Sequence, residues 1–440
     1  MALTHVRMPT QVFIPGKNWR LSLAELVSLL EARKAMFKVY SFSKEFFVVR
    51  NEEDRGFWAI ADLGGFIRIG DVAARFSTES MKQAFLQKSR EAKDQISRDV
   101  ASSGLIEGMV KAVSGKTVFG VSVYSAESSL RSVSKSVQRF VGSALKRELA
   151  VYGKKSKFMG FAKDRKYPQL SHVEVLRKKL VENRAEVLFC VGKEQTFIAV
   201  TTAVHNPFEF QKRDVGKPVQ RKIFGIPPRL ARIMVNLAAC TEGRVLLDPF
   251  CGVGTILQEA LLSKAKVIGV DINRWCVEAA ERNLKWLKSE YSLENTEYRV
   301  LQGDVRRLSQ KIGWEQVDCI ATEPDLGPAL RQVPTTSYAQ RITEKLEPLY
   351  YDLLEEAYKV LKKKGRLVVV APYIKTRLGK PVTMRIEEKA VEIGFEKVCP
   401  FKRERFATSA MVTEKLMAMA SFVDVEERHK IGREIHVFQR

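Results

Sequence analysis

The sequence predicts an α/β protein in which a C-terminal Rossmann-like domain follows smaller α+β units. Strand and helix patterns alternate after Pro228, which indicates a parallel sheet flanked by helices. A chain of 440 residues is long enough for two or three domains. Basic side chains outnumber acidic ones by 74 to 51, and most of the resulting charge of +23 lies in residues 1–225. We therefore expect a polyanionic partner, with nucleic acid favoured over an acidic membrane face.

Several other classes of protein are not expected. No apolar run approaches the ~18 residues that a membrane-spanning helix needs. The first residues contain no apolar signal core, so secretion is not expected. The six cysteines lie far apart, without a Cys-x-x-Cys pair, so neither a disulfide framework nor a zinc or other metal site is expected. Such cysteine usage is typical of a reducing cytoplasm.

Residues 1–75 have the pattern of a small α+β domain. Leu23, Leu26, Val27 and Leu30 repeat at helical spacing, and Ser22 is a suitable cap. The elements expected in this domain are a strand at 11–14, a helix at 21–32, and strands at 46–49 and 57–60. Residues 76–115 are polar and helical in character, and we expect them to connect this domain to the next.

Residues 116–205 form a second predicted α+β domain. Its expected elements are strands at 118–124, 186–191 and 196–203, and helices at 133–150 and 171–183. A dense basic stretch with interleaved aromatic residues lies within it. Its cations are Lys146, Arg147, Lys154, Lys155, Lys157, Lys163, Arg165 and Lys166. A solvated protein face and an RNA surface are about equally favoured, since these residue types neutralise phosphates and stack on bases.

Residues 206–228 are rich in Pro and Gly and are expected to be a linker before a domain at 229–440. Arg213 and Arg229 either shape a pocket there or tie the linker down through salt bridges. The strongest motif of the chain follows. A buried strand ends at Asp248, a turn contains Gly252 and Gly254, and a helix begins near Thr255. Glycines in such a turn allow the backbone to approach a ligand closely.

Two further predicted strands also end in acidic residues, namely Asp271 and Asp304. Three acidic strand ends suit a nucleoside with few phosphates, and S-adenosylmethionine, which is positively charged at sulfur, fits this description. The alternative is a dinucleotide site. That alternative is disfavoured because Leu257 replaces the third glycine of G-x-G-x-x-G and because Asp248 would repel a pyrophosphate.

A fourth predicted strand, at 317–321, leads into Thr322-Glu323-Pro324-Asp325-Leu326-Gly327-Pro328. Together with the segments 208–218, 227–238 and 248–260, this arrangement resembles the tRNA guanine-N2 methyltransferases that carry a THUMP domain, of the type acting on guanosine 10. The resemblance implies a ferredoxin-like unit at 1–75, an RNA-binding THUMP domain at 116–205 and a class I methyltransferase domain at 229–440. It also implies tRNA as substrate and allows for a small activating protein subunit.

The resemblance also implies roles for individual residues. Residues of the glycine turn would line the methionine part of S-adenosylmethionine. The residues after the strands that end at Asp271 and Asp304 would bind the ribose and the adenine. The expected cofactor-binding residues are Asp248, Phe250, Cys251, Gly252, Gly254, Thr255, Asp271, Ile272, Asp304, Val305 and Thr322.

The expected catalytic residues are Glu323, Pro324, Asp325 and Leu326, and they depart from the family motif of Asp or Asn, Pro, Pro, then Tyr or Phe. Glu323 takes the place of the acidic or amide acceptor for the target amine. Asp325 is a further acceptor or base, and Leu326 lacks the stacking that an aromatic ring offers. The expected function is therefore tRNA methylation at a guanine amine. The alternatives are an RNA-binding protein with a degenerate site, or methylation of another atom or another RNA.

Overall fold

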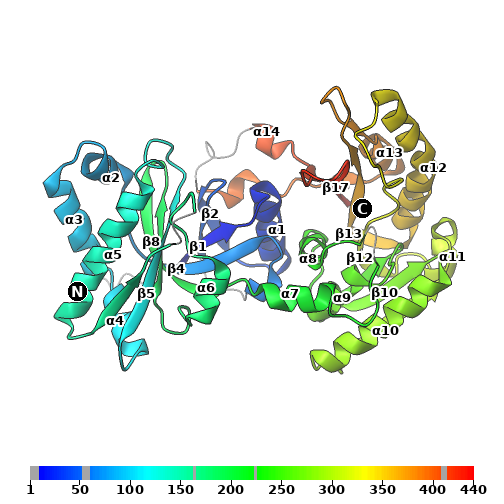
Figure 1. Cartoon of the computed structure of the whole chain (residues 1–440). Helices are drawn as coiled ribbons and strands as arrows, with labels where there is room; N and C mark the ends of the chain where they lie inside the picture. Colours follow the sequence, from blue (N-terminus) through cyan, green and yellow to red (C-terminus); the bar gives the residue numbers. More distant parts are fainter. Residues whose placement is uncertain (1–8, 52–59, 162–164, 222–224, 408–413) are drawn as a thin grey trace, which may run out of the picture.

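The computed structural model describes residues 9–51, 60–161, 165–221, 225–407 and 414–440. Two β-sheets organise this part of the chain, one of eight and one of nine strands. The first sheet contains strands from the N-terminal half and the second contains strands from the C-terminal half (Figure 1). We refer to residues 10–204 as the N-terminal unit and to residues 228–439 as the C-terminal unit.

The N-terminal unit is built on one continuous sheet with the strand order β2-β3-β1-β4-β8-β7-β5-β6. Its strands are β1 (Thr10–Pro15), β2 (Phe37–Phe42), β3 (Phe47–Asn51), β4 (Phe66–Ser77), β5 (Thr117–Ser125), β6 (Ser156–Met159), β7 (Glu186–Val191) and β8 (Gln195–Val204). The long strand β4 pairs with β1 on one side and with β8 on the other. Both small domains expected from the sequence therefore share a single sheet.

The first helix, α1 (Trp19–Ala32), begins earlier than expected and has a different cap. Asn18 is the N-cap, because its side-chain oxygen accepts a hydrogen bond from the backbone N–H of Leu21 at 3.4 Å. The predicted cap, Ser22, lies inside the first turn and donates its hydroxyl to the carbonyls of Asn18 and Gly65. The prediction for Ser22 was wrong because the helix begins at Trp19, which makes Ser22 its fourth residue. The strand expected at 57–60 lies almost entirely outside the described residues.

Helices cover one face of the β5–β8 part of this sheet. They are α2 (Thr78–Phe85), α3 (Arg90–Ala101), α4 (Leu105–Ala112), α5 (Ser134–Val151) and the short α6 (His172–Arg177). Ile96 of α3 and Met109 of α4 are fully buried in the same core as Val141 of α5 and Phe119 of β5. The expected helical character of residues 76–115 is confirmed, and these helices pack as part of that core.

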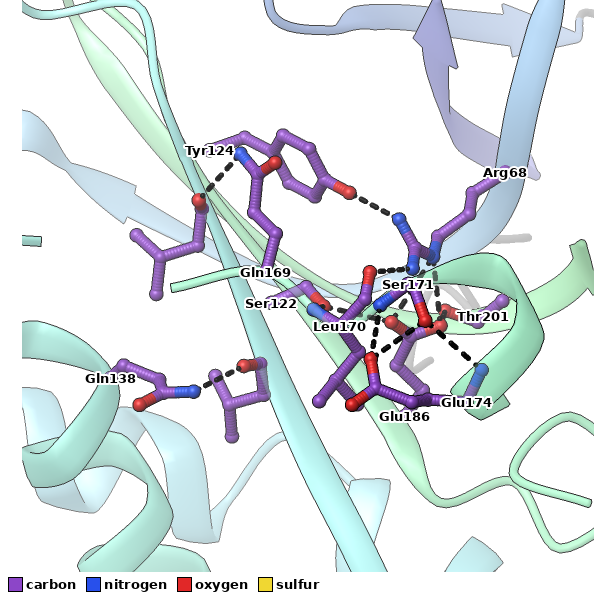
Figure 2. Close-up of polar contacts among 12 residues, drawn as sticks. Arg68, Ser122, Tyr124, Gln138, Gln169, Leu170, Ser171, Glu174, Glu186 and Thr201 are labelled. Atoms are coloured by element: carbon purple, nitrogen blue, oxygen red, sulfur yellow. Dashed lines mark hydrogen bonds and ion pairs between the residues drawn. The ribbon is translucent and has the colours of Figure 1, made fainter. Parts of the chain in front are cut away.

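A buried polar network joins the two halves of the N-terminal sheet (Figure 2). Arg68 of β4 is 2% exposed and donates to Glu186 of β7 at 3.1 Å and to the hydroxyl of Tyr124 of β5 at 2.5 Å. The carboxylate of Glu186 also accepts hydrogen bonds from the hydroxyl groups of Ser122 and Thr201, both at 2.8 Å. The guanidinium also donates to the carbonyl of Leu170. A buried ion pair is tolerated here because its polar atoms are satisfied.

The C-terminal unit has the strand order β11-β10-β9-β12-β13-β17-β15. The first five strands are parallel, whereas β17 runs antiparallel to β13 and to β15. This is a doubly wound sheet with one reversed strand, which confirms the Rossmann-like expectation. Its strands are β9 (Val245–Asp248), β10 (Lys266–Asp271), β11 (Tyr298–Gln302), β12 (Val317–Thr322), β13 (Leu361–Ile374), β14 (Val382–Thr383), β15 (Glu396–Lys397), β16 (Ser421–Asp424) and β17 (Ile431–Gln439).

Helices cover both faces of this sheet (Figure 1). One group packs with α1 of the N-terminal unit in a common core and consists of α8 (Pro228–Leu237), α9 (Thr255–Leu262) and α10 (Arg274–Glu290). The opposite face carries α11 (Leu308–Ile312), α12 (Thr336–Val360) and α13 (Ile386–Ile393). Two smaller helices are α7 (Pro207–Asp214), which lies inside the expected linker, and α14 (Glu414–Met417).

The two units are held together by buried polar contacts between α1 and α8. Glu25 of α1 is fully buried and accepts hydrogen bonds from the backbone N–H groups of Gly64 and Gly65 at 2.7 and 2.8 Å. Asn236 of α8 donates to the same carboxyl group at 2.8 Å, and Arg229 donates to the carbonyl of Gly64 at 2.7 Å. Burial raises the pKa of Glu25 to about 7. The shared apolar core and these contacts fix the first strands of the N-terminal unit against the C-terminal sheet.

Candidate active site

The predicted acidic strand ends meet at one edge of the C-terminal sheet. Asp248 and Asp271 are the last residues of the adjacent parallel strands β9 and β10, and Asp304 follows β11. On the other side of β9, strand β12 ends at Thr322 and is followed by Glu323. The carboxyl ends of parallel strands at the point where strand order reverses are the usual ligand position in such sheets.

Asp248 is the buried carboxyl group of this edge. It is 2% exposed, and its Oδ1 accepts hydrogen bonds from the hydroxyl of Thr322 at 2.7 Å and from the backbone N–H of Phe250 at 3.2 Å. Burial is the main reason why its pKa rises to about 7, and the nearby charges of Asp271 and Glu323 raise it further. A cationic group placed beside this carboxyl would therefore relieve an unfavourable buried charge.

The glycine turn after β9 has the backbone shape that the motif predicts. Gly252 and Gly254 have φ angles of +52° and +85°, a region that side-chain-bearing residues rarely adopt. The N–H of Gly252 donates to Oδ2 of Asp271 at 2.9 Å, which ties the turn to the end of β10. At Gly254, a Cβ atom would lie 3.2 Å from Cβ of Ala280 on α10. The turn therefore needs glycine both for its conformation and for close packing.

The other predicted cofactor residues take up different positions around this turn. Asp271 accepts a second hydrogen bond from the N–H of Asn273 at 2.9 Å, and the neighbouring Ile272 is 64% exposed. Asp304 forms an ion pair with Arg306 at 2.9 Å, and hydrogen bonds from Arg306 are the main reason why its pKa is lowered. In contrast, Val305 is 4% exposed and packs in the core beneath α12.

Phe250, Cys251 and Thr255 complete the predicted set. Phe250 is partly buried and packs against the core of the α12 face. Cys251 is 5% exposed, and burial holds the pKa of its thiol well above the usual value, so it is unsuited to act as a nucleophile. The hydroxyl of Thr255 accepts a hydrogen bond at 2.9 Å from the buried ammonium group of Lys217.

The segment expected as a linker is tied onto the C-terminal unit by buried ion pairs. Glu259 of α9 is fully buried and accepts from Arg213 at 2.7 Å and from Arg232 at 3.0 Å. Asn283 of α10 donates to the carbonyl of Val219 at 2.9 Å. For Arg213, the structure thus favours the tie over a pocket-lining role, because Arg213 is 5% exposed and its ion-pair partner Glu259 is fully buried.

The predicted catalytic loop begins with a carboxylate that already has a partner. Nε of Arg433, on β17, donates to Glu323 Oε2 at 2.5 Å, and Nη2 donates to Oε1 at 3.1 Å. The two side chains are only 9% and 14% exposed. This bidentate pair places a guanidinium beside the group predicted to accept the substrate's N–H bonds.

The rest of the loop is fixed by its backbone. Pro324 is buried, whereas the side chain of Asp325 is exposed and its Oδ1 accepts the N–H of Gly327 at 2.9 Å. Tyr350 of α12 donates its hydroxyl to the carbonyl of Asp325 at 3.0 Å. Leu326 is partly buried and packs against the core shared with α1.

The basic stretch lies at the far end of the N-terminal sheet, at the end of α5 and along the edge strand β6 (Figure 1). Its exposed cations are Lys146, Arg147, Lys155, Lys157 and Lys166. Lys154 is half-buried and donates to the carbonyl of Val113, and Arg165 pairs with Glu174 at 2.6 Å. Lys163 lies outside the described residues.

Sequence reasoning missed Arg433. It lies 110 positions beyond Glu323, as the third residue of β17, and no local motif marks it. The sequence pattern predicts a final strand only over residues 434–439, so Arg433 falls just before the predicted strand.

Comparisons with known proteins point to the same kind of domain. Residues 219–395 match a family model described as an RMKL-like methyltransferase domain. Residues 147–282 also match a model described as a DNA methylase, although this stretch runs across both sheets. A solved structure of TrmN from Thermus thermophilus aligns over 99% of this chain and all of its own, at 17% identity and a TM-score of 0.49.

Two curated relatives carry the same name, tRNA (guanine(10)-N2)-dimethyltransferase. The protein of Methanothermobacter thermautotrophicus is 36% identical over 160 residues, which cover 36% of this chain and 42% of that protein. The protein of Pyrococcus abyssi is 35% identical over 164 residues, which cover 37% of this chain and 44% of that protein. The matched stretch thus spans less than half the length of either relative.

Among the described residues, no helix is both long and apolar enough to cross a membrane.

Proposed function

We propose that this chain is an S-adenosylmethionine-dependent tRNA methyltransferase that methylates the exocyclic N2 amine of a guanosine, of the position-10 type named for its relatives. One observation carries the proposal: the glycine turn, the acidic strand ends and the Glu323 loop meet at one sheet edge. The relatives that bear the name of this activity support it.

The sheet edge suits the proposed cofactor, whose positively charged sulfur makes its methyl group electrophilic. The buried carboxyl of Asp248 favours a nearby cation. The carboxylate of Asp271 lies at the end of β10 with each oxygen holding one backbone N–H, so lone pairs remain for ribose hydroxyls. Exposed Ile272, next to it, offers an apolar surface to an adenine ring.

The Glu323 loop suits an aryl amine, which is a weak nucleophile because its lone pair is delocalised into the ring. In the reaction, the amine nitrogen gains a methyl group, the donor's carbon–sulfur bond breaks, and the amine releases one proton. Glu323 and the carbonyl of Pro324 accept the two N–H bonds and orient the lone pair. Asp325, exposed at the loop, serves as a second acceptor or takes up the proton, and Leu326 presses on the base.

In this proposal the N-terminal unit binds tRNA. Residues 1–75 act as a ferredoxin-like unit and residues 116–205 as a THUMP domain, within a cytoplasmic enzyme. The exposed cations at the end of α5 and along β6 support this role, because lysine and arginine neutralise phosphates. A small activating protein subunit remains part of the proposal, so assays compare the chain alone with the chain co-purified from its source cells.

Labelled methyl transfer tests the proposal. The wild-type chain should transfer label into tRNA that lacks the modification, and Glu323→Ala or Asp325→Ala should lose transfer while still binding the cofactor. Glu426→Ala is a matched control, because Glu426 is a partly exposed glutamate that pairs with Arg428 in the loop between β16 and β17. The proposal is wrong if no tRNA pool accepts label from the wild-type chain, with or without its co-purified proteins.

A second candidate is an RNA-binding protein whose catalytic site is degenerate. The observation that favours it is the guanidinium of Arg433, which occupies both oxygens of Glu323. It predicts cofactor binding without turnover, and unchanged RNA affinity in Glu323→Ala. A third possibility is methylation of another atom or another RNA. Mass spectrometry of tRNA nucleosides from cells with and without the gene distinguishes the proposed guanine methylation from methylation of another atom of tRNA.

A further inference from the structure

The contact between Glu323 and Arg433 connects two strands that the chain separates widely. Glu323 follows the end of β12, and Arg433 lies on β17, two strands away across β13. The Nη2 atom of Arg433 also reaches the carbonyl of Gly225, just before α8, at 3.4 Å. Arg433 therefore touches the catalytic loop and the segment that enters the C-terminal unit.

The charged and polar groups around this pair come from three strands, from α12, from the loop after β12 and from Glu426 in the loop before β17. Asp248 on β9 and Asp271 on β10 lie on one side of Glu323, and both are acidic. Asp325 and the hydroxyl of Tyr350 lie on the side of α12. Asp424 of β16 is the register partner of Arg433, so it faces the guanidinium rather than Glu323. Within this described environment, Arg433 is the cation that bonds Glu323.

Arg433 acts on both the charge and the conformational freedom of the Glu323 side chain. Glu323 follows β12 beside β9, which ends in the buried carboxyl group of Asp248, so a nearby cation is needed to compensate the negative charge gathered there. Glutamate also has one more methylene group than the aspartate or asparagine expected at this position, so it has more rotamers to lose. A bidentate guanidinium restricts the carboxylate and compensates its charge.

We propose that Arg433 is the positioning residue of the proposed methyltransfer reaction, compensating the charge of the Glu323 carboxylate and holding it aimed at the substrate amine. The two N–H groups of the Arg433 guanidinium use one lone pair of each Glu323 oxygen. Each oxygen keeps a second lone pair that can accept an N–H bond from the substrate. The inference rests on the proposed function, and it explains how a glutamate replaces the shorter acceptor. Arg433 itself does not touch the reacting atoms in this scheme.

The experiment compares Arg433→Met, Arg433→Lys and Arg428→Met with the wild-type chain, using labelled methyl transfer into unmodified tRNA. Arg428 is the matched control, because it is an arginine that pairs with a glutamate near the same strand but is 79% exposed. We expect kcat to fall about 10- to 100-fold in Arg433→Met, as for other displaced catalytic groups, with little change in KM. Arg433→Lys should recover part of kcat, and Arg428→Met should match the wild type.

The pH profile separates positioning from a purely structural role. In Arg433→Met, the acid limb of the kcat profile should move to higher pH, because the unpaired carboxylate binds a proton more readily. Arg433→Lys should lie between the two. The proposal is overturned if the acid limb of Arg433→Met is unchanged and its kcat falls only in proportion to the loss of folded protein. Thermal melting measures that loss. A lower KM with an unchanged limb would overturn the proposal too, because it would show that the guanidinium competes with the substrate.

A readout without turnover keeps this inference distinct from the proposed function. Carboxyl carbons of glutamate are labelled with 13C, and the Glu323 signal is assigned with Glu323→Gln. The titration midpoint of that signal should be higher in Arg433→Met than in the wild-type chain. If this shift occurs but no tRNA accepts label, the proposed reaction is wrong and the positioning contact stands. If label transfer occurs without the shift, the positioning role is wrong.

Discussion

At the scale of single residues, burial gives Asp248 an unusual carboxyl group. Within the described part of the chain, the hydroxyl of Thr322 and the backbone N–H of Phe250 both donate hydrogen bonds to its Oδ1. These two bonds lower its pKa, but burial outweighs them and the value rises to about 7. A carboxyl group that is half protonated near neutral pH binds a cation with a clear pH dependence.

We expect the affinity for S-adenosylmethionine to rise with pH through about 7, since the ionised form of Asp248 is the one that attracts the cationic sulfur. Below that pH the affinity should fall by up to about tenfold per pH unit. Isothermal titration calorimetry between pH 6 and 8 measures it. Thr322→Val removes a hydrogen bond that favours the ionised form, so its midpoint should lie higher. Equal affinity of the wild type at pH 6 and 8 would contradict this assignment.

Some single residues could be predicted from the sequence and others could not. Gly254 was predicted from its motif, because a helix that starts directly after a tight turn needs a residue at positive φ. The cap of α1 was assigned to Ser22, although Asn18 fills that role. Both residue types are good caps, and Asn18 takes the role because the helix begins at Trp19, three residues before Ser22.

At the scale of elements, strand β4 decides the architecture of the N-terminal unit. It pairs with β1 through residues 66–71 and with β8 through residues 68–77, so strands of both expected domains share one sheet. Its sequence, FIRIGDVAARFS, contains a glycine, an aspartate and two alanines, which weakens its strand signal. Long-range pairing with neighbours on both sides provides the hydrogen bonds that local preference does not predict.

The buried ion pair of Arg68 allows the link between β4 and β7 to be tested. Arg68→Met should lower the free energy of unfolding by about 3–5 kcal/mol, because it leaves the fully buried Glu186 without its cation. Urea unfolding of the purified chain measures the effect. Arg33→Met is the control, because Arg33 pairs with Asp62 at the surface, and such pairs contribute only about 0–1 kcal/mol. A loss below about 1 kcal/mol in Arg68→Met would show that the network adds little to stability.

At the scale of the whole molecule, the charge has a spatial arrangement. The exposed cations at the end of α5 and on β6 lie at the end of the N-terminal sheet farthest from β2 in strand order. The acidic strand ends lie in the other unit, at the edge where the glycine turn meets β12. The contacts of Glu25 and Arg229 hold the two units in one arrangement.

Charge reversal tests the proposed RNA surface. The double variant Lys155→Glu and Lys157→Glu should weaken tRNA binding and reduce its salt dependence, because each lost phosphate contact lowers the slope of log affinity against log salt by about 0.7 to 0.9. Filter binding at several salt concentrations measures both effects. The matched control is Lys264→Glu and Lys266→Glu, which makes the same charge change on the C-terminal unit. If both double variants lose the same amount of tRNA affinity, the effect comes from the net charge of the protein and not from a specific RNA surface.

The Rossmann-like class of the C-terminal unit, the glycine turn and the acidic strand ends could all be predicted from the sequence. These features follow from short-range patterns, in which a strand, a turn and a helix occupy neighbouring positions. Three other features emerge only in the folded chain: β4 joins the N-terminal strands, Arg213 and Arg232 share Glu259, and Arg433 holds Glu323. Such contacts join residues far apart in the chain, because burial and charge compensation act across space and leave no local pattern.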